Sequence, residues 1–143
     1  MKNSILNKVL LSEAGVAALI LRVTVGLILA AHGAQKLFGW FGGNGLAGNA
    51  GWLSSIGIEP GFLMAILAGS AEFFGGLALV LGLLTRPAAL ITAFTMLVAI
   101  FSVHISNGLF VADGGYEYAL ILMIALAVQG GGYFSIDKVL SEK

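Results

Sequence analysis

Four apolar segments, each about long enough to cross a lipid bilayer, constrain this chain more than any short motif in it. They cover approximately residues 16–38, 62–84, 88–107 and 116–134. An α-helix rises ~1.5 Å per residue, so about 20 apolar residues span the roughly 30 Å of hydrocarbon in a bilayer. Each segment therefore predicts one transmembrane helix. The 143 residues suffice for one domain, and we expect an all-α membrane protein, a bundle of four transmembrane helices.

The amino-acid composition excludes a domain with a water-facing surface. Only 10% of the residues are charged and 59% are hydrophobic, whereas soluble domains carry about 25% charged residues. Seven basic residues balance seven acidic ones, and no basic patch predicts a nucleic-acid partner. The chain contains no cysteine, which excludes thiol–disulfide chemistry and iron–sulfur ligation by its own side chains.

Loop charges predict the orientation of the chain, because lysine and arginine in short loops mark the cytoplasmic side of a membrane protein. One side of the predicted bundle carries Lys2, Lys8, Arg86, Lys138 and Lys143. The opposite side has only one basic residue, Lys36, which lies at its border. We therefore expect both termini in the cytoplasm and the chain in the inner membrane of a bacterial or archaeal cell, with lipid as its immediate partner.

Glycine and asparagine dominate the segment between the first two predicted helices, Gly39 to Gly61. This density breaks regular structure, and we expect a loop there with a short interfacial helix at about Leu46 to Ile56. A tight turn, Thr85 to Pro87, separates the second and third predicted helices. Pro87 suits the first position of the third helix, where no amide donor is needed.

Six ionisable residues fall inside or at the ends of the predicted spans, where charge is costly and commonly serves a function. They are Arg22, His32, Lys36, Glu72, His104 and Glu117. We interpret Glu72, His32 and His104 as candidate catalytic residues. The candidate ligand-binding residues are Arg22, Lys36 and Glu117. Without partners, each buried charge would cost several kcal/mol.

Helical periodicity places most of these charges on two faces that also carry small residues. At 100° per residue, one arc of about 120° on the first helix holds Arg22, Gly26, His32, Gly33 and Lys36. One face of the second helix holds Ala65, Gly69, Glu72 and Gly76. Small residues let membrane helices approach closely, so we expect these two faces to meet. We expect Glu72 to pair with Arg22 or with His32.

An outer group of His32, Lys36, His104 and Glu117 suits a quinone-like ligand. Histidine exchanges protons near neutral pH, and such side chains can hydrogen-bond carbonyl or hydroxyl oxygens and relay protons. The two histidines could instead ligate a haem b, or hold a divalent metal together with Glu117, but no further pattern supports either cofactor. The alternative without chemistry is that the buried charges only fix the helix register.

Several short runs together resemble the DoxX family. The runs are Leu21–Gly26, His32–Phe38, Glu72–Leu77, Gly82–Arg86 and Glu117–Leu120. His104 at the end of the third helix completes the resemblance, which covers about residues 19–130. Each run alone is weakly specific, and the ensemble is what points to the family.

The resemblance implies a four-helix protein of the bacterial inner membrane. Members of the family are associated with archaeal quinol oxidase and with thiosulfate:quinone oxidoreductase. Others, encoded near functions in aromatic catabolism or quinone resistance, are labelled oxidoreductases. The positions that match the family pattern are Arg22, His32, Lys36, Glu72, His104 and Glu117.

We therefore expect a membrane subunit that supports redox chemistry of quinones or related small aromatics. A soluble or membrane partner subunit would supply the electrons, because the sequence has no glycine-rich dinucleotide loop between a strand and a helix. A small-molecule or proton-coupled permease is the first alternative, since charges at the midplane also suit a transport path. Four helices would then require a homo-oligomer. A non-catalytic membrane scaffold is the second alternative.

Overall fold

The computed structural model describes residues 15–127 and 136–141, and this part of the chain is helical without a strand. Its α-helices are α2 (Val16–Phe38), α3 (Gly45–Ser55), α4 (Gly61–Leu81), α5 (Thr85–Ala99), α6 (Glu117–Ala127) and α7 (Ile136–Ser141). Shorter 3-10 turns are η1 (Trp40–Gly42), η3 (Ile105–Asn107) and η4 (Val111–Asp113). A π-helical turn, η2, covers Ile100–His104.

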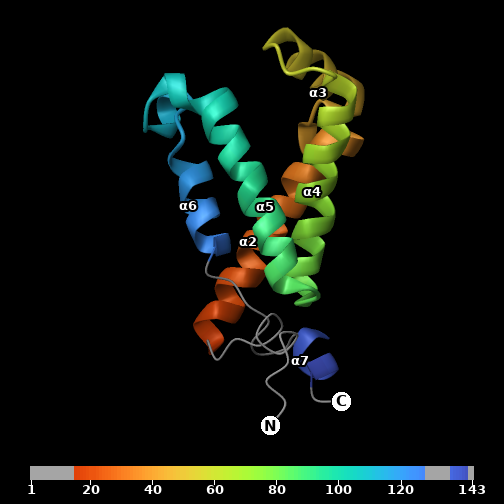
Figure 1. Cartoon of the computed structure of the whole chain (residues 1–143), viewed down its shortest axis with the longest axis vertical. Coiled ribbons are helices and arrows are strands. Elements are labelled where there is room, and N and C mark those ends of the chain that lie inside the picture. The colour runs from red at the N-terminus through yellow and green to blue at the C-terminus, as the bar shows by residue number, and fades with distance from the viewer. Residues whose placement is uncertain (1–14, 128–135, 142–143) are drawn as a thin grey trace.

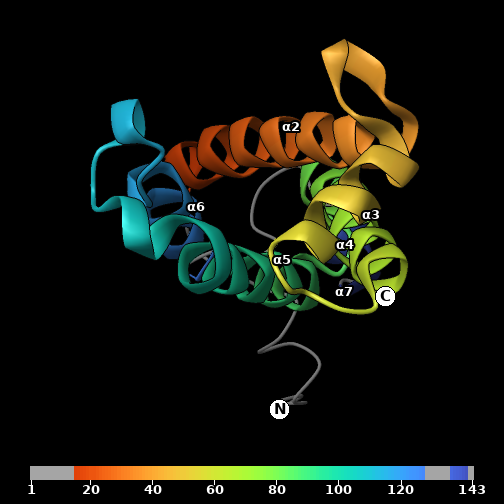
Figure 2. The same ribbon diagram turned by 90° about the horizontal axis from the view of Figure 1, so that it is seen from above.

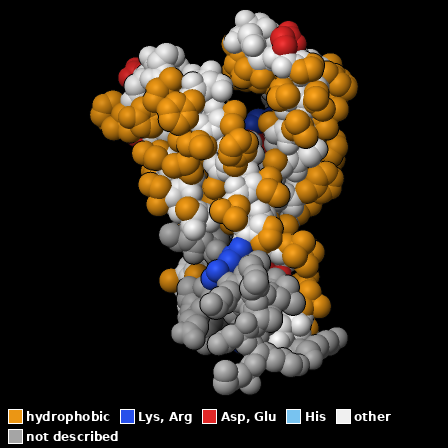
Figure 3. Space-filling view, viewed as in Figure 1, with side chains coloured by type: hydrophobic (Ala, Val, Ile, Leu, Met, Phe, Trp, Pro, Cys, Tyr) orange, Lys and Arg blue, Asp and Glu red, His pale blue; other side chains and the backbone are white. Residues whose placement is uncertain are grey.

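Three helices are long and apolar enough to cross a membrane: Val16–Phe38, Gly61–Leu81 and Thr85–Asn107, the last combining α5 with η2 and η3. The apolar helix α6 is shorter, and the rest of the predicted fourth span, residues 128–134, lies outside the described residues. Large apolar side chains cover the sides of these helices, as the orange surface in Figure 3 shows. Water would not solvate so extensive an apolar surface, and the prediction of an all-α membrane protein is confirmed.

The described helices form two arms that meet at one end and separate at the other (Figure 1). One arm contains α4 with α3 at its tip, and the other contains α5 and α6. Seen from above, α2 and α5 lie on opposite sides, with α6 toward one edge and α4 toward the other (Figure 2). We call the end bearing α3 and η1 the α3 end. The opposite end, where α2 begins and α7 lies, is the α7 end.

Glycines bring α2 and α4 into backbone contact along the seam between them. A Cβ atom on Gly26 would lie 2.7 Å from the carbonyl oxygen of Gly76, and one on Gly33 would overlap the backbone of Phe73. The face of α4 expected from the sequence is buried: Ala65, Gly69, Glu72 and Gly76. The expectation that two small-residue faces meet is therefore confirmed. Larger side chains at these glycines would force the helices apart.

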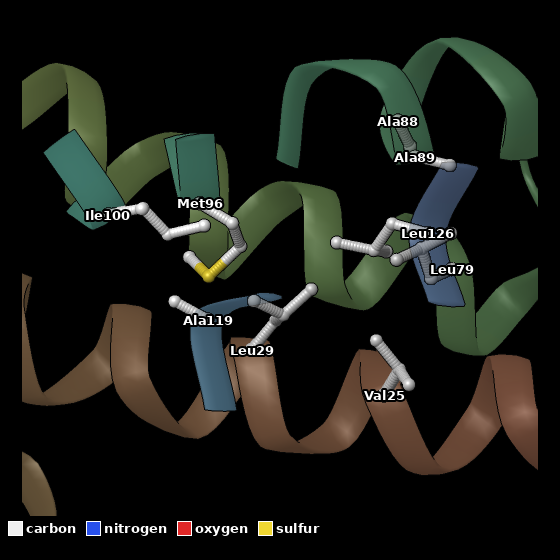
Figure 4. Close-up of a cluster of buried hydrophobic side chains, with 9 residues drawn as sticks. All are labelled: Val25, Leu29, Leu79, Ala88, Ala89, Met96, Ile100, Ala119 and Leu126. Carbon is white, nitrogen blue, oxygen red and sulfur yellow. The ribbon is translucent and has the colours of Figure 1, made fainter. Parts of the chain in front are cut away.

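A hydrophobic core joins both arms to α2. Its side chains come from α2, α4, α5, η2 and α6 and are drawn in Figure 4: Val25, Leu29, Leu79, Ala88, Ala89, Met96, Ile100, Ala119 and Leu126. Leu29, Leu79 and Leu126 are at most 1% exposed. Close packing of this kind fixes how the two arms are held against α2.

The boundaries of the second and third predicted helices differ from the structure. Helix α4 ends at Leu81 rather than near Leu84, because Gly82 takes the left-handed conformation (φ 67°) that terminates helices. Helix α5 begins at Thr85, so Pro87 occupies its third position and not its first. The regular helix then stops at Ala99, and the π turn carries the chain on to His104.

Asp137 holds α7 against the turn between α4 and α5. Its carboxylate oxygens accept hydrogen bonds from the backbone N–H groups of Leu84 (2.7 Å) and Thr85 (2.8 Å). Its own N–H donates to the carbonyl oxygen of Gly82 (2.9 Å). The carboxylate therefore caps the N-terminus of α5 from a distant part of the chain. Asp137 is fully buried and attracts the guanidinium of Arg22 electrostatically.

Candidate functional site

The buried carboxylate of Glu72 forms an ion pair with the ammonium group of Lys36. Glu72 lies at the middle of α4, and Lys36 lies in the last turn of α2. The Glu72 side chain is 2% exposed, whereas the Lys36 side chain is 33% exposed. Lys36 thus neutralises a deeply buried carboxylate while part of the lysine side chain stays accessible.

The second carboxylate oxygen of Glu72, Oε2, is buried and accepts no hydrogen bond from the residues that the structure describes. A buried carboxylate oxygen without a donor costs free energy relative to the same oxygen in water. Glu72 also lines two cavities. Its free oxygen is therefore available to a hydroxyl or amide group of a ligand.

The pairing of Glu72 with Lys36 replaces the partners expected from the sequence. Gly33 packs against the backbone of Phe73, so Glu72 lies beside the last turns of α2. Arg22 precedes Gly33 by eleven residues, roughly 16 Å along the helix. The expected pair of Glu72 with Arg22 is wrong for this reason. Arg22 lies at the α7 end, where Asp137 attracts it, and does not join the site.

A cavity of about 630 Å³, which we call the main cavity, lies between α2, the α5–η2 segment and α6. Its ionisable lining consists of His32, Lys36, Glu72 and His104, in addition to the phenol of Tyr118. Apolar side chains form most of the remainder, among them Leu21, Val25, Ile28, Ile121 and Leu122. The volume falls within the range of about 300–1,000 Å³ that is typical of small-molecule sites.

Two further cavities adjoin the main cavity at the α3 end. The first, of about 390 Å³, shares the same four ionisable residues and is lined on its other side by α3. We call it the side cavity. The second, of about 400 Å³, is lined by Lys36 together with polar groups such as Gln35 and Asn44, and we call it the vestibule. Figure 3 shows a hollow between the two arms at this end, with a basic side chain inside it.

His32 and His104 come from different helices and both line the main and side cavities. Nδ1 of His104 lies 2.7 Å from the carbonyl oxygen of Gly114. A carbonyl oxygen only accepts hydrogen bonds, so Nδ1 carries the proton and Nε2 of the neutral ring is an acceptor. The structure therefore brings four of the six predicted residues together: His32, Lys36, Glu72 and His104.

Glu117 is the first residue of α6, beside the loop at the α3 end, and lies outside the cavities. Its Oε1 accepts a hydrogen bond from the N–H of Val111 (2.9 Å), and its own N–H donates to Leu109 (3.0 Å). It lines none of the three cavities. The described residues contain no group of three His, Cys, Asp or Glu side chains that could hold a metal ion. His32, His104 and Glu117 thus do not form the donor set considered from the sequence.

Sequence reasoning missed the contribution of α3 to the site. Asn49 is 9% exposed and, like Trp52, lines both the side cavity and the vestibule. The two residues are three positions apart and so share one face of the helix. Their spacing on the short helix predicted at about Leu46 to Ile56 was the available signal.

Comparison with known proteins finds a matching family model and several related proteins. The family model DoxX matches residues 17–105. "Putative oxidoreductase CatD" of Bacillus subtilis (strain 168) is 31% identical over 123 residues, which cover 85% of each chain. "Inner membrane protein YqjF" of Escherichia coli (strain K12) is 31% identical over 134 residues, which cover 90% of this chain and 95% of that protein. No solved structure matches the chain.

Proposed function

Because the chain is a bacterial inner-membrane protein that belongs to the DoxX family, we propose that it is the quinone-binding membrane subunit of a quinone-linked oxidoreductase system. The observation that carries the proposal is the main cavity, which is apolar along most of its length and ionisable at one end. Quinones have the same division, with polar oxygens on an apolar ring. A relative, CatD, bears the word oxidoreductase in its name, which supports chemistry of this class.

The hydrogen-bonding atoms of the site favour the reduced ligand, a quinol. Oε2 of Glu72 and Nε2 of neutral His104 are both acceptors. A quinol carries two O–H donors, whereas a quinone carries only acceptor oxygens. A buried acceptor left without a donor costs roughly 1–3 kcal/mol. The quinol is therefore the better complement to these two atoms, and Lys36 and His32 remain available to donate to its oxygens.

Oxidation of a bound quinol to the quinone releases two electrons and two protons. Glu72 and His104 are placed to receive the protons of the two hydroxyl groups as general bases. The vestibule beside Lys36 offers these protons a polar route to the membrane surface. The electrons pass to a partner subunit with its own redox cofactor, because this chain carries no dinucleotide loop.

A transport path for polar solutes has weaker support than a binding site. Beyond the ionisable groups, the main cavity is lined by apolar side chains such as Val25, Leu29 and Leu122. A polar solute would lose its hydration there without gaining hydrogen bonds. The cavity therefore suits an apolar ligand with one polar end.

We also propose that the α7 end faces the cytoplasm, since Arg86 and Lys138 lie there and basic residues favour that side. The native chain has no cysteine, so single cysteines can be labelled without background. In intact spheroplasts, a membrane-impermeant maleimide should label Glu59→Cys and spare Lys138→Cys. The reverse pattern would overturn the orientation.

The test of the proposed function is a binding titration with the protein in lipid nanodiscs. A tailless dimethoxy-methyl benzoquinol and its oxidised quinone are titrated separately, with heat of binding and tryptophan fluorescence as readouts. Trp52 lines the side cavity and should report occupancy. We expect saturable binding, with the quinol bound at least several-fold more tightly than the quinone.

The variant Glu72→Gln should weaken quinol binding about tenfold, since the amide replaces the buried carboxylate as acceptor. Glu59→Gln is the matched control, because Glu59 is an exposed glutamate outside the three cavities. Equal loss in both variants, or no saturable binding by the native protein, would contradict the proposal.

A further inference from the structure

The main cavity is much longer than the head group of the proposed quinol ligand. Its α2 wall runs from Leu21 to Lys36, roughly 22 Å along the helix. The ionisable side chains occupy only the α3 end of this length. The remainder is an apolar channel that a single ring would leave largely unfilled.

The apolar channel opens sideways between α2 and α6. Ile28 of α2 is 42% exposed and Ile121 of α6 is 61% exposed, although both line the cavity. The bilayer surrounds the sides of a membrane protein, so exposed apolar side chains there contact lipid. On the other side of α2, the seam with α4 is closed by the backbone contacts of Gly26 and Gly33. Of these two seams, the one between α2 and α6 is therefore open to the bilayer.

We propose that this gap holds the tail of a membrane-dissolved quinol, which reaches the site sideways from the bilayer. The inference rests on the proposed function and specifies its ligand class as a quinol with a long apolar tail. The head group lies at Glu72 and His104, and the tail runs between Ile28 and Ile121 toward Leu21.

The energetics of this arrangement determine what an experiment can detect. Moving the tail from lipid into the gap changes its surroundings little, since lipid chains are as apolar as leucine side chains. The gap therefore provides access, and the affinity comes from the hydrogen bonds of the head group. A tailed and a tailless quinol should bind equally well when compared at equal mole fraction in the membrane.

Obstructing the gap tests the proposal, because it should affect the tailed ligand alone. The probes are the dimethoxy-methyl benzoquinol without a tail and the same quinol with a decyl tail, titrated into nanodiscs. We expect Ile28→Trp and Ile121→Trp each to weaken binding of the decyl quinol at least tenfold. Binding of the tailless quinol should change less than twofold.

Two matched controls carry the same substitution one position or one turn away. They are Leu27→Trp and Ile124→Trp. Leu27 is 57% exposed and Ile124 is 55% exposed, and neither residue lines any of the three cavities. Both should bind either ligand as the native protein does.

The outcomes separate this inference from the proposed function. Equal binding of the decyl quinol to the native protein and to both gap variants would overturn the inference while the proposed function stands. Loss of both ligands in the gap variants would also overturn it, because the gap would then belong to the head-group site. Competition by a decyl alcohol, which lacks the ring, would assign the gap to ordinary lipid chains. Absence of any binding of the tailless quinol would overturn both.

Discussion

Two buried carboxylates, Asp137 at the α7 end and Glu72 at the middle of α4, face basic residues of the same helix, yet their surroundings differ. At the α7 end, both oxygens of Asp137 accept hydrogen bonds from the backbone of Leu84 and Thr85. At the middle of α4, Glu72 is buried to a similar degree, but its Oε2 accepts no hydrogen bond from the described residues. Cavities adjoin Glu72, and none of the three cavities is lined by Asp137.

The difference separates a carboxylate that stabilises the fold from one that is available to a ligand. A buried carboxylate with all its hydrogen-bond partners rigidifies a structure, whereas one with an unused oxygen beside a cavity can accept a hydrogen bond from a ligand. Substitution of Asp137 should therefore lower stability, and substitution of Glu72 should lower ligand binding.

The largest expected effect is the loss of stability in Asp137→Asn. The amide keeps one acceptor and places a donor near a backbone N–H group, and Arg22 loses its nearby negative charge. We expect the free energy of unfolding to fall by about 2–4 kcal/mol, measured by thermal unfolding in detergent with tryptophan fluorescence. Asp113→Asn, at an exposed position, should leave unfolding unchanged. A stable Asp137→Asn protein would remove the basis of the comparison.

Gly33→Ala should have the next largest effect, because it disturbs the contact between α2 and α4. This contact determines which part of α2 lies beside Glu72. The new Cβ would meet backbone atoms of Phe73, which cannot move aside as a side chain can. We expect a loss of about 2 kcal/mol in unfolding free energy, with weaker quinol binding. In Gly51→Ala nothing lies within 4 Å of the new Cβ, and this helical glycine should gain about 0.5–1 kcal/mol. Similar thermal unfolding in the two variants would show that the seam tolerates separation.

Glu72→Gln should cost less stability than Asp137→Asn, although both remove a buried charge. Lys36 is one-third exposed, so its ammonium group can be hydrated after the ion pair is lost. We expect a decrease in unfolding free energy of about 1 kcal/mol or less, measured in the same thermal assay. A decrease equal to that of Asp137→Asn would mean that Glu72 mainly stabilises the fold.

His104→Ala should give the smallest effect, a roughly threefold loss of quinol affinity with little change in unfolding. A single neutral hydrogen bond contributes about 0.5–1.5 kcal/mol. Asn107→Ala is the control, because Asn107 also donates to Gly114 but lines none of the three cavities. Equal losses in both variants would show that the loop, and not the imidazole, determines binding.

The helices and their contact faces were predictable from the sequence, since apolar length and glycine spacing act locally. The predicted first span, 16–38, coincides with α2, and the buried face of α4 contains the predicted residues. The partner of Glu72 was not predictable. Pairing depends on the position of α4 along α2, and this position would have to be known to within one helical turn. The backbone contacts of Gly26 with Gly76 and of Gly33 with Phe73 determine that position.

Two further features depend on contacts that no local pattern encodes. Asp137 lies in a short polar segment, and the turn that it caps is more than fifty residues away in the sequence. Glu117 was assigned to the ligand site from its depth and from its match to the family pattern. Its hydrogen bond to Val111 shows that a charge at the end of a span can instead order the adjoining loop.

The π turn at Ile100–His104 determines the direction in which the His104 side chain leaves the helix. A π turn contains one more residue than an α turn would need to close its hydrogen bond. If the same residues instead formed a regular α-helix, the side chains after this point would be rotated by about 100°. His104 would then leave the cavity wall although its chemistry was unchanged. The geometry of this site is thus encoded in the spacing of residues as well as in their identity.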